Sequence, residues 1–508
     1  MMVYINRMTK FNVNKNGFIM AKSELSDKRI AIIGGGIAGA SIALYLSEVG
    51  LQVDLFEKGI SLVNGPPICH LHAGGNLYRE ISEQQCITLL KESIEALRLY
   101  PDSVDYRPTV VAIPQQDAGK PVDLLPRLRL LKKEYQKLID QDTNNQVLGE
   151  VSEYYRLFEL EELQKLALLD EHKVPKTAEQ WMIPFAKHVD LSLLKFPVVL
   201  VQEFGWNVFR LGATAALSLE KNALCELHLN SKVTKIEQTK QQKWSITSEQ
   251  NNIQHSSEFD YLINAAGFKT GEIDDLAGFY RQRLVEFKAA YVTQWKGTDG
   301  LWPEIVFHGQ RGTPEGMAQF TPYTNNLVQL HGMTDEITLF DNGLVANAEN
   351  SSQPQLDPQF LRKIDKGWLN QEIAVRGERA IAHLSRYIPA FKEATVTGKP
   401  LFGAQQIPGE DASLRAAGVS FENNNYARCE IVKASSVLTC ADGLMQKLCE
   451  IGYVDKSIVG SRLFPITHSI SDQAITERSE LYTQQRGYPL ALAHRNIKQL
   501  VVDVTAID

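Results

Sequence analysis

What the chain lacks excludes several classes of protein. Its six cysteines form no CxxC pair, so neither a zinc ribbon nor a thioredoxin-like site is expected. They are also too few for a disulfide framework. Lys and Arg number 53 against 60 Asp and Glu, which gives a net charge of −7. A mildly acidic chain has no general attraction for nucleic acid or anionic lipid, so nucleic acid is not an expected partner.

Long apolar runs are absent as well. Residues 1–28 carry basic and polar groups without the apolar core of a signal peptide, and residues 1–26 are expected to be flexible. The most apolar stretch, residues 31–46, is short for a membrane span and is interrupted by glycines. We therefore expect no transmembrane segment and, from the low cysteine count, a reducing cytoplasmic setting. Peripheral membrane contact and the oligomeric state are left open.

The 508 residues contain enough apolar material for a large core. The hydrophobic share is 44% and the charged share is 22%, as in ordinary globular proteins, which excludes wholesale disorder. At about 100–200 residues per domain, this length predicts two or three domains.

Hydrophobic periodicity predicts a mixture of helices and strands. We expect helices at residues 83–99, 124–140, 159–169, 211–219 and 360–387. We expect strands at residues 109–114, 231–237, 244–248, 261–265, 287–294, 304–307, 317–321 and 327–331. The last four of these strands suit an antiparallel sheet, and the polar stretch 343–358 that follows them is expected to be a loop.

The clearest structural unit lies near the start of the chain. Residues 29–33 (RIAII) form an apolar, β-branched run typical of a buried strand, and residues 51–57 (LQVDLFE) form a second one. A glycine cluster and an apolar helix at residues 38–49 separate the two. This is a βαβ unit, whose parallel strands belong inside a larger sheet.

The glycine cluster matches a dinucleotide-binding fingerprint. Gly34, Gly36 and Gly39 give the spacing GxGxxG directly after a strand and at the start of a helix, which is the context the motif requires. The first glycine permits the tight turn, the second lets a pyrophosphate approach the backbone, and the third lets the helix pack against the strand. The helix N-terminus then offers N–H groups to the phosphates.

Glu57 extends the match beyond the glycines. It ends the second strand 18 residues after Gly39, close to the distance expected for the acid that binds ribose hydroxyls. GxGxxG with such an acid suits NAD and FAD equally. The cofactor contacts expected from this unit are Gly34, Gly36, Ile37, Ala38, Gly39, Glu57 and Lys58.

A motif more than 200 residues downstream separates the two cofactors. Residues 260–267 (DYLINAAG) resemble the second FAD motif of the D-amino-acid oxidase/glycine oxidase superfamily, in which a strand ends in a small-small-Gly turn beside the dinucleotide. Residues 204–211 (FGWNVFRL) resemble a further segment of that family, and residues 317–332 resemble the strands that roof its flavin. The resemblance runs with gaps from about residue 29 to residue 449, and it implies an oxidoreductase that uses FAD.

The resemblance also implies particular FAD contacts. Ala265, Ala266 and Gly267 are small enough to let the backbone come close to the dinucleotide. Val233 occupies the place where the family holds adenine through backbone groups of a valine.

The C-terminal flavin motif departs from the family pattern. Residues 403–408 lack the usual arginine, and residues 431–436 (IVKASS) replace a glycine-rich turn. Ser435 is expected to cap a helix that runs to about residue 449, whose N-terminus would stabilise negative charge on reduced flavin. Lys433 would add a positive charge there, with a solvated loop lysine as the alternative.

The stretch 64–79 follows Glu57, and in the family such a stretch crosses under the flavin ring. Ala73 and Gly74 permit that close approach. His72 stands where some relatives attach FAD covalently, although a non-covalent contact is the favoured interpretation. Arg79 lies where related amine oxidases bind the substrate carboxylate, with a surface ion pair as the alternative.

Further candidates lie in the strand-rich half. Arg311 belongs to a glycine-flanked loop (HGQRG) that would act as a lid, and Tyr323 and His331 either face the substrate or complete the polar face of a sheet. The predicted catalytic residues are thus Arg79, Lys433 and Arg311. No Ser/His/Asp, HExxH or paired-carboxylate arrangement appears in the sequence, and no metal ligands are predicted. The chemistry is therefore expected from the flavin.

The expected fold class is α/β: a Rossmann-like FAD-binding domain with an inserted antiparallel α+β substrate domain. The FAD-binding domain is expected from residues 27–115, 195–275 and 400–460, the substrate domain from 116–194 and 276–399, and a C-terminal extension from 461–508. The expected reaction is oxidation of a C–N or C–O bond in a small amino or hydroxy acid, with hydride transfer to flavin N5. The alternatives are a same-fold dehydrogenase that passes electrons to quinone or another protein, and a non-enzymatic binding protein.

Overall fold

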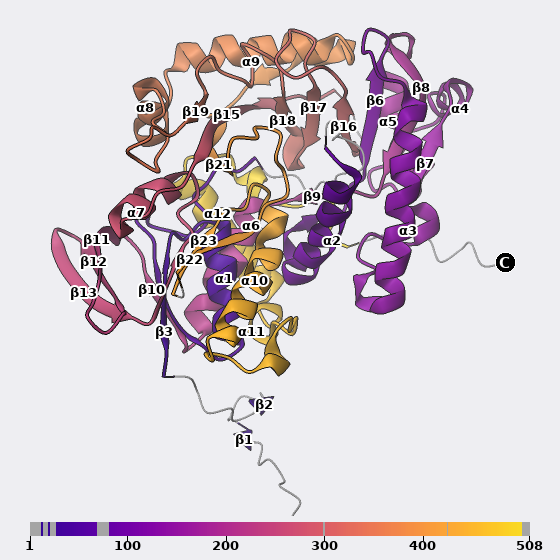
Figure 1. Cartoon of the computed structure of the whole chain (residues 1–508). Coiled ribbons are helices and arrows are strands. Elements are labelled where there is room, and N and C mark those ends of the chain that lie inside the picture. Colours follow the sequence, from indigo (N-terminus) through magenta and orange to yellow (C-terminus); the bar gives the residue numbers. More distant parts are fainter. Residues whose placement is uncertain are drawn as a thin grey trace, which may run out of the picture.

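Two sheets organise the chain (Figure 1). The computed structural model describes residues 12–13, 19–20, 27–68, 81–297, 300–423 and 425–499. Within residues 1–26, which were expected to be flexible, it describes the antiparallel pair β1 (Asn12–Val13) and β2 (Ile19–Met20), and the rest lies outside the described residues. No helix in the described ranges is long and apolar enough to cross a membrane.

The first sheet has six strands in the order β10-β4-β3-β14-β23-β22. Its strands are β3 (Arg29–Ile33), β4 (Gln52–Phe56), β10 (Cys225–His228), β14 (Tyr261–Asn264), β23 (Tyr426–Cys429) and β22 (Val419–Glu422). All are parallel except β22, which pairs antiparallel with β23 at the edge. The RIAII run of β3 lies between two strands, which explains why it is apolar on both faces.

Helices cover one face of this sheet, and a small antiparallel sheet covers the other. The helices are α1 (Ile37–Glu48), α2 (Glu83–Leu99), α6 (Val208–Lys221) and α10 (Val437–Glu450). The opposite face carries β11 (Lys232–Gln238), β12 (Trp244–Gln250), β13 (Ile253–Phe259) and the helix α7 (Thr270–Ala277). Ile30 and Ile32 accordingly join one apolar core, whereas Ala31 and Ile33 join another.

The second sheet has ten strands. Eight follow the order β19-β15-β18-β17-β16-β6-β8-β7, and two more pair with β15. They are β6 (Thr109–Pro114), β7 (Tyr155–Phe158), β8 (Leu194–Val201), β15 (Arg283–Gln294), β16 (Glu304–Phe307), β17 (Ala318–Pro322), β18 (Leu327–Gly332), β19 (Leu344–Ala346), β20 (Thr395–Val396) and β21 (Leu401–Pro408). A further short pair joins β5 (Val104–Asp105) to β9 (Gly205–Trp206).

The two faces of the ten-stranded sheet differ. One face packs its apolar side chains against α5 (Ala178–His188) and α9 (Asn370–Ser385), the latter along the top of Figure 1. The other face looks toward the six-stranded sheet, because Ala290 and Val292 of β15 belong to the same core as α1. The sheet therefore separates a helical layer from the half of the molecule that carries the glycine motif.

The remaining helices pack around these layers. They are α3 (Leu125–Gln141), α4 (Leu160–Leu166), α8 (Pro358–Lys366), α11 (Pro465–His468) and α12 (Asp472–Gln485). Helix α12 packs on α6, so residues 472–485 cover the half that contains the six-stranded sheet.

Most expected elements are present, several with shifted ends, and three differ in other ways. The helix expected at 360–387 is two helices, α8 and α9, because the chain breaks at Gly367, whose φ of 88° is unsuited to a helix. The loop expected at 343–358 contains the short strand β19. Helix α10 begins at Val437 after a 3₁₀ turn, so its N-cap is Ser436 rather than Ser435.

The α/β fold class is confirmed, whereas the expected domain boundaries stay a prediction. Strands β6, β8 and β21 lie in the ranges expected for the FAD-binding domain. In the structure they pair with strands of the ten-stranded sheet. The chain therefore passes between the two halves close to these three strands.

Candidate active site

The glycine loop joins β3 to α1 and is packed against the end of β14. Gly34 has a φ of 104°, and a Cβ atom there would lie 2.5 Å from the carbonyl oxygen of Ala265. A Cβ atom on Gly39 would overlap the carbonyl oxygen of Gly34. Gly34 and Gly39 are therefore required by the packing of strand, turn and helix, as the fingerprint predicts.

Gly36 has a different reason to be glycine. Its φ of −65° suits any residue, and no heavy atom in the described part of the chain lies within 4 Å of a Cβ built on it. Gly36 is the N-cap of α1, and among the described residues no side chain caps this helix and no acid stands in its first turn. The N–H groups of the first turn, which begins with Ile37 and Ala38, thus have no side-chain cap among the described residues, an arrangement suited to a phosphate.

Glu57 lies beside this loop at the end of β4. Its carboxylate accepts hydrogen bonds from the backbone N–H of Gly35 at 2.7 Å and of Gly59 at 2.6 Å. The two bonds fix the carboxylate next to the glycine loop and leave each oxygen a second lone pair. Lys58, the next residue, is exposed.

Two more expected contacts converge on the same corner. Ala265 follows β14 directly, and its N–H donates to the carbonyl oxygen of Ile33 at 2.8 Å, which keeps the turn of Ala265, Ala266 and Gly267 against the glycine loop. Val233 lies in β11, two residues after Ser231, whose N–H donates to the carbonyl oxygen of Glu57 at 2.9 Å. The residues expected to hold the pyrophosphate, ribose and adenine are thus neighbours.

The family model described as FAD dependent oxidoreductase matches residues 29–399, a span that contains the glycine loop, Glu57 and the turn after β14. The chain belongs to this FAD-dependent oxidoreductase family. Membership makes the protein an enzyme whose cofactor is FAD, and it removes the alternative of a non-enzymatic binding protein. The open space at Gly36 and the placed carboxylate of Glu57 fit such a dinucleotide.

Individual curated proteins match a much shorter part of this oxidoreductase than the family model does. The tRNA 5-methylaminomethyl-2-thiouridine biosynthesis bifunctional protein MnmC of Campylobacter jejuni is 37% identical over 62 residues. That match covers 12% of this chain and only 10% of the curated relative's length, so the relative's activity does not transfer to this chain.

Solved structures show the same fold at low identity. The L-proline dehydrogenase from P. horikoshii is 14% identical, with a TM-score of 0.53, over 87% of this chain and 97% of that chain. The glycerol-3-phosphate dehydrogenase from Bacillus halodurans, complexed with FAD, is 12% identical, with a TM-score of 0.55, over 92% of this chain and 74% of that chain. These likenesses establish the fold and leave the substrate open.

The ten-stranded sheet turns a polar face toward the FAD-binding half. Alternation along β15 to β18 places polar side chains on the face that carries Val292, and apolar ones on the face toward α5 and α9. This polar sheet face consists of Glu286, Lys288, Glu304, Gln319, Thr321, Gln329 and His331. Most of these side chains are buried, and buried polar groups concentrated between two halves of an oxidoreductase are the expected lining of an active site.

One end of the polar sheet face carries a cluster of three charges. Glu286 pairs with Lys288 at 2.9 Å through one carboxylate oxygen and with Arg311 through the other. Burial alone would raise the pKa of Glu286, but the two cations hold it below its ordinary value. Burial lowers the pKa of Lys288 to about 8, against the opposing effect of Glu286. Gln405 of β21 donates to Glu286 at 3.2 Å.

The other end is held by a second buried ion-pair cluster. Arg107 donates to Asp105 at 2.8 Å and to Glu304 of β16 at 3.0 Å, and the amide of Gln319 donates to the same Glu304 carboxylate. Because the two carboxylates and the cation are all buried, each is held in place by the others. This cluster fixes β16 and β17 relative to β5.

The catalytic residues predicted from the sequence have different outcomes. Arg311 lies in the cluster with Glu286, as described above. Lys433 precedes the 3₁₀ turn that contains Ser435 and leads into α10. Arg79 and the expected flavin contacts His72, Ala73 and Gly74 lie outside the described residues, so their roles stay predictions.

The N-terminus of α10 has a neighbour that the sequence did not reveal. The hydroxyl of Ser436 donates to the carboxylate of Glu92 on α2 at 2.6 Å. Burial raises the pKa of Glu92 to about 6, while hydrogen bonds from Ser436 and Thr439 oppose that rise. A carboxyl group therefore already stands at the helix end that was expected to face the flavin.

Tyr323 and His331 lie near the polar sheet face. The hydroxyl of Tyr323 donates to the side chain of Gln329 at 3.3 Å, and His331 stands directly opposite Gln319 in the antiparallel pair of β17 and β18. Both side chains thus belong to a polar layer of the sheet, which agrees with either of their two interpretations.

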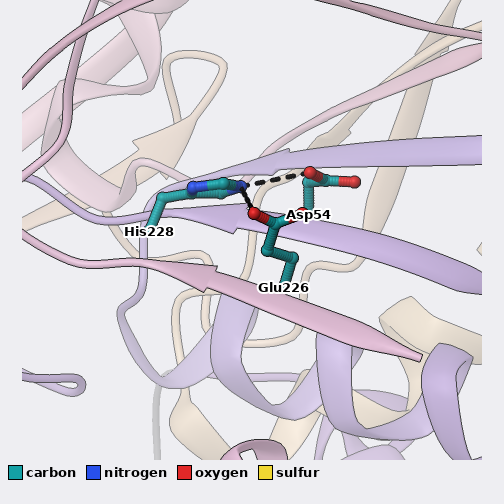
Figure 2. Close-up of side chains that lie close together, drawn as sticks. All are labelled: Asp54, Glu226 and His228. Atoms are coloured by element: carbon teal, nitrogen blue, oxygen red, sulfur yellow. Dashed lines mark hydrogen bonds and ion pairs between the residues drawn. The ribbon is translucent and has the colours of Figure 1, made fainter. Parts of the chain in front are cut away.

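A cluster of possible metal ligands lies elsewhere, on β4 and β10 (Figure 2). Ligand atoms of Asp54, Glu226 and His228 lie within 4.8 Å of one another, and Figure 2 shows the imidazole pointing at both carboxylates. Arg29 donates to the same Asp54 oxygen that His228 contacts, at 2.8 Å. The ion pairs with Arg29 and His228 already give the buried Asp54 carboxylate its partners.

Glu286 and Lys288 are the functional candidates that sequence reasoning missed. The strand expected there, residues 287–294, left Glu286 outside it, and Lys288 within it was not singled out as a candidate. Their signal was two opposite charges at alternate positions in the otherwise apolar run LVEFKAAYV of residues 284–292. Charges placed in this way on a buried strand need a partner or a ligand.

Proposed function

We propose that this oxidoreductase oxidises a C–N or C–O bond of a small amino or hydroxy acid. The supporting observation is the polar sheet face opposite the FAD-binding half, which gathers buried hydrogen-bonding groups and the cation Lys288, with a second cation, Arg311, paired to its Glu286. FAD supplies the chemistry when bound, because its N5 accepts the hydride from the substrate carbon. The role of the protein is to bind, to orient and to exclude water.

The residues of the polar sheet face divide these tasks. Cations can hold a substrate carboxylate and so fix the direction of the adjacent C–H bond. Glutamine and threonine side chains can hydrogen-bond an amine or hydroxyl group without adding charge. We expect no strong base among them, since oxidation of a neutral amine or alcohol depends mainly on alignment.

The test is anaerobic bleaching of the flavin. Purified holoenzyme is mixed without oxygen with amino acids and hydroxy acids, one at a time, and absorbance near 450 nm is followed. A bleaching substrate that carries a carboxylate supports the proposal. Bleaching only by compounds without a carboxylate, such as simple amines or phosphate esters, contradicts it.

The electron acceptor is a separate question with its own measurement. We propose that electrons pass either to oxygen or to a quinone or protein acceptor. Oxygen uptake during turnover identifies an oxidase, whereas reduction of a quinone or dye without oxygen uptake identifies a dehydrogenase.

A cytoplasmic location is also proposed. The cysteines of the described part of the chain are all free thiols, and Cys86, Cys429 and Cys440 are buried. Unpaired thiols suit a reducing compartment. Cell fractionation tests this directly.

A further inference from the structure

Residues 62–66 connect the glycine loop to the strand next to the cluster of Glu286, Lys288 and Arg311. Leu62 packs against Gly35 of that loop, and Pro66 packs against Gly403 of β21. Three residues lie between Leu62 and Pro66, so the two are at most about 14 Å apart along the chain. Gly403 is the cross-strand partner of Lys288, and cross-strand partners share a face. Lys288 is therefore on the face that Pro66 covers, toward the FAD-binding half.

The two cations have hydrogen-bonding capacity to spare. In the described part of the chain, the Lys288 ammonium has three N–H bonds and contacts one acceptor, Glu286. The guanidinium of Arg311 contacts Glu286 and the weak acceptor Met333 Sδ, the latter at 3.1 Å, and its side chain is 39% exposed. A guanidinium has five N–H donors, so both cations can bind a further oxygen ligand.

The charge of the cluster suits a monoanion. One carboxylate and two cations give a net charge of +1, and Gln405 adds a neutral amide. The side chain of Lys288 is only 14% exposed, so its charge is weakly screened by water. A dianion such as a phosphate ester would exceed this charge and approach the carboxylate of Glu286 closely.

We propose that Lys288 and Arg311, both held by Glu286, form a subsite for the carboxylate of the substrate, and that Lys288 determines its specificity. The inference rests on the proposed function and narrows it. The Arg311 guanidinium binds the carboxylate from the exposed side, and the Lys288 ammonium binds it from the buried side. Glu286 keeps the two cations a fixed distance apart and disfavours cationic side chains and dianionic phosphates.

Acetate is the probe for this subsite, because it carries a carboxylate and cannot be oxidised at an amine or hydroxyl group. Oxidised holoenzyme is titrated with acetate, and both the flavin absorption spectrum and the thermal midpoint Tm are recorded. We expect saturable binding that Lys288→Met weakens roughly tenfold or more, as for the loss of a charge-assisted contact. Lys288→Arg should bind acetate within about threefold of the parent, because the charge is retained.

Lys363→Met is the matched control. Lys363 is also a buried lysine that pairs with a glutamate, Glu372 at 3.1 Å, but it lies on α8, on the far side of the ten-stranded sheet. Its replacement should leave acetate binding unchanged even where it lowers Tm. If Lys288→Met binds acetate as well as the parent does, or if inorganic phosphate binds more tightly than acetate, the inference is wrong.

A pH series on the unaltered holoenzyme keeps the inference testable if Lys288→Met does not fold. The charged groups that act on Lys288 are Glu286 on its own strand, Arg311 after β16 and Arg415 after β21. Because the pKa of Lys288 lies near 8, acetate binding should weaken as the pH rises through that value. Affinity that does not change between pH 7 and pH 9 would overturn the inference.

The outcomes separate this inference from the proposed function. Acetate binding that depends on Lys288, without bleaching by any amino or hydroxy acid, would support the subsite and reject the proposed reaction. Bleaching by such an acid, with acetate binding that is independent of Lys288, would keep the reaction and reject the subsite.

Discussion

Glu57 shows how one side chain can serve both the loop and the cofactor. Its carboxylate accepts hydrogen bonds from Gly35 and Gly59, and it is also the expected ribose ligand. Glu57→Gln would place an amide NH₂ against one of these N–H donors. We expect FAD to bind more weakly by about 1–3 kcal/mol, the scale of a lost charged hydrogen bond.

Fluorescence titration of the deflavinated protein with FAD measures this change. The control is Glu226→Gln, an exposed glutamate on the neighbouring strand β10, which should leave the affinity unchanged. Equal affinities of Glu57→Gln and the parent would mean that Glu57 supports the loop without contacting the ribose.

Substitutions at Gly36 and Gly39 should affect different properties: cofactor binding at Gly36 and stability at Gly39. A methyl group at Gly36 enters the open space in front of α1, so Gly36→Ala should fold normally and bind FAD at least about tenfold more weakly. A methyl group at Gly39 meets the backbone of Gly34, so Gly39→Ala should lower Tm even without FAD. Measurements of Tm and FAD affinity on the two deflavinated variants test this difference. The prediction is wrong if both variants change in the same way.

The residues that sequence could identify are those whose role follows from local spacing. Gly34, Gly36 and Gly39 are fixed by one turn, and Glu57 is fixed by the strand that follows the helix. The roles of Glu286 and Lys288 depend instead on which face of β15 is buried. They also depend on Arg311, which is more than 20 residues away in the chain. That information resides in the pairing of distant strands, which spacing alone does not give.

At the scale of elements, the contact between α2 and α10 should make stability depend on pH. The pKa of Glu92 is raised from 4.5 to about 6 in the folded protein, so folding favours the protonated form. The stabilisation from this group is fully present below pH 4.5 and is lost as the pH rises through about 6. Glu92→Gln cannot ionise, and its amide oxygen can still accept the bond from Ser436.

We therefore expect Glu92→Gln to gain stability relative to the parent between pH 4.5 and pH 8, by roughly 2 kcal/mol. Urea unfolding at several pH values gives the comparison. Glu450→Gln, an exposed glutamate at the end of α10, should follow the parent at every pH. If the free energies of unfolding of Glu92→Gln and the parent differ by the same amount at every pH, Glu92 does not titrate in this range.

Elements were predicted best where the local pattern is strong. Residues 83–99, 109–114 and 304–307 match α2, β6 and β16 residue for residue. The helix expected at 360–387 failed because its apolar pattern continues past Gly367, where the left-handed φ ends α8. Strands β20 and β21 were not expected, since each is stabilised by pairing with β15, about a hundred residues earlier in the chain.

At the scale of the whole molecule, helix α12 and the residue that follows it are part of the FAD-binding half. The family model ends at residue 399, yet Arg486 at the end of α12 donates to the carbonyl oxygens of Val63, Asn64 and Gly65. Its guanidinium also stacks near the rings of Phe209 and Tyr488. One half-buried cation thus fixes the stretch that leads from Glu57 toward Pro66.

We expect Arg486→Lys to release FAD faster than the parent, because an ammonium cannot satisfy three separated carbonyl oxygens in place of a planar guanidinium. Each hydrogen bond that is lost costs about 0.5–1.5 kcal/mol, so Tm should fall as well. Arg478→Met is the control, since Arg478 also joins α12 to α6, through an ion pair with Glu220 at 2.6 Å, but does not touch residues 63–65. Dilution of the holoenzyme with flavin fluorescence as the readout measures release. If both variants release FAD faster, the cause is weaker packing of α12. If only Arg486→Lys releases FAD faster, the cause is the lost contact with residues 63–65.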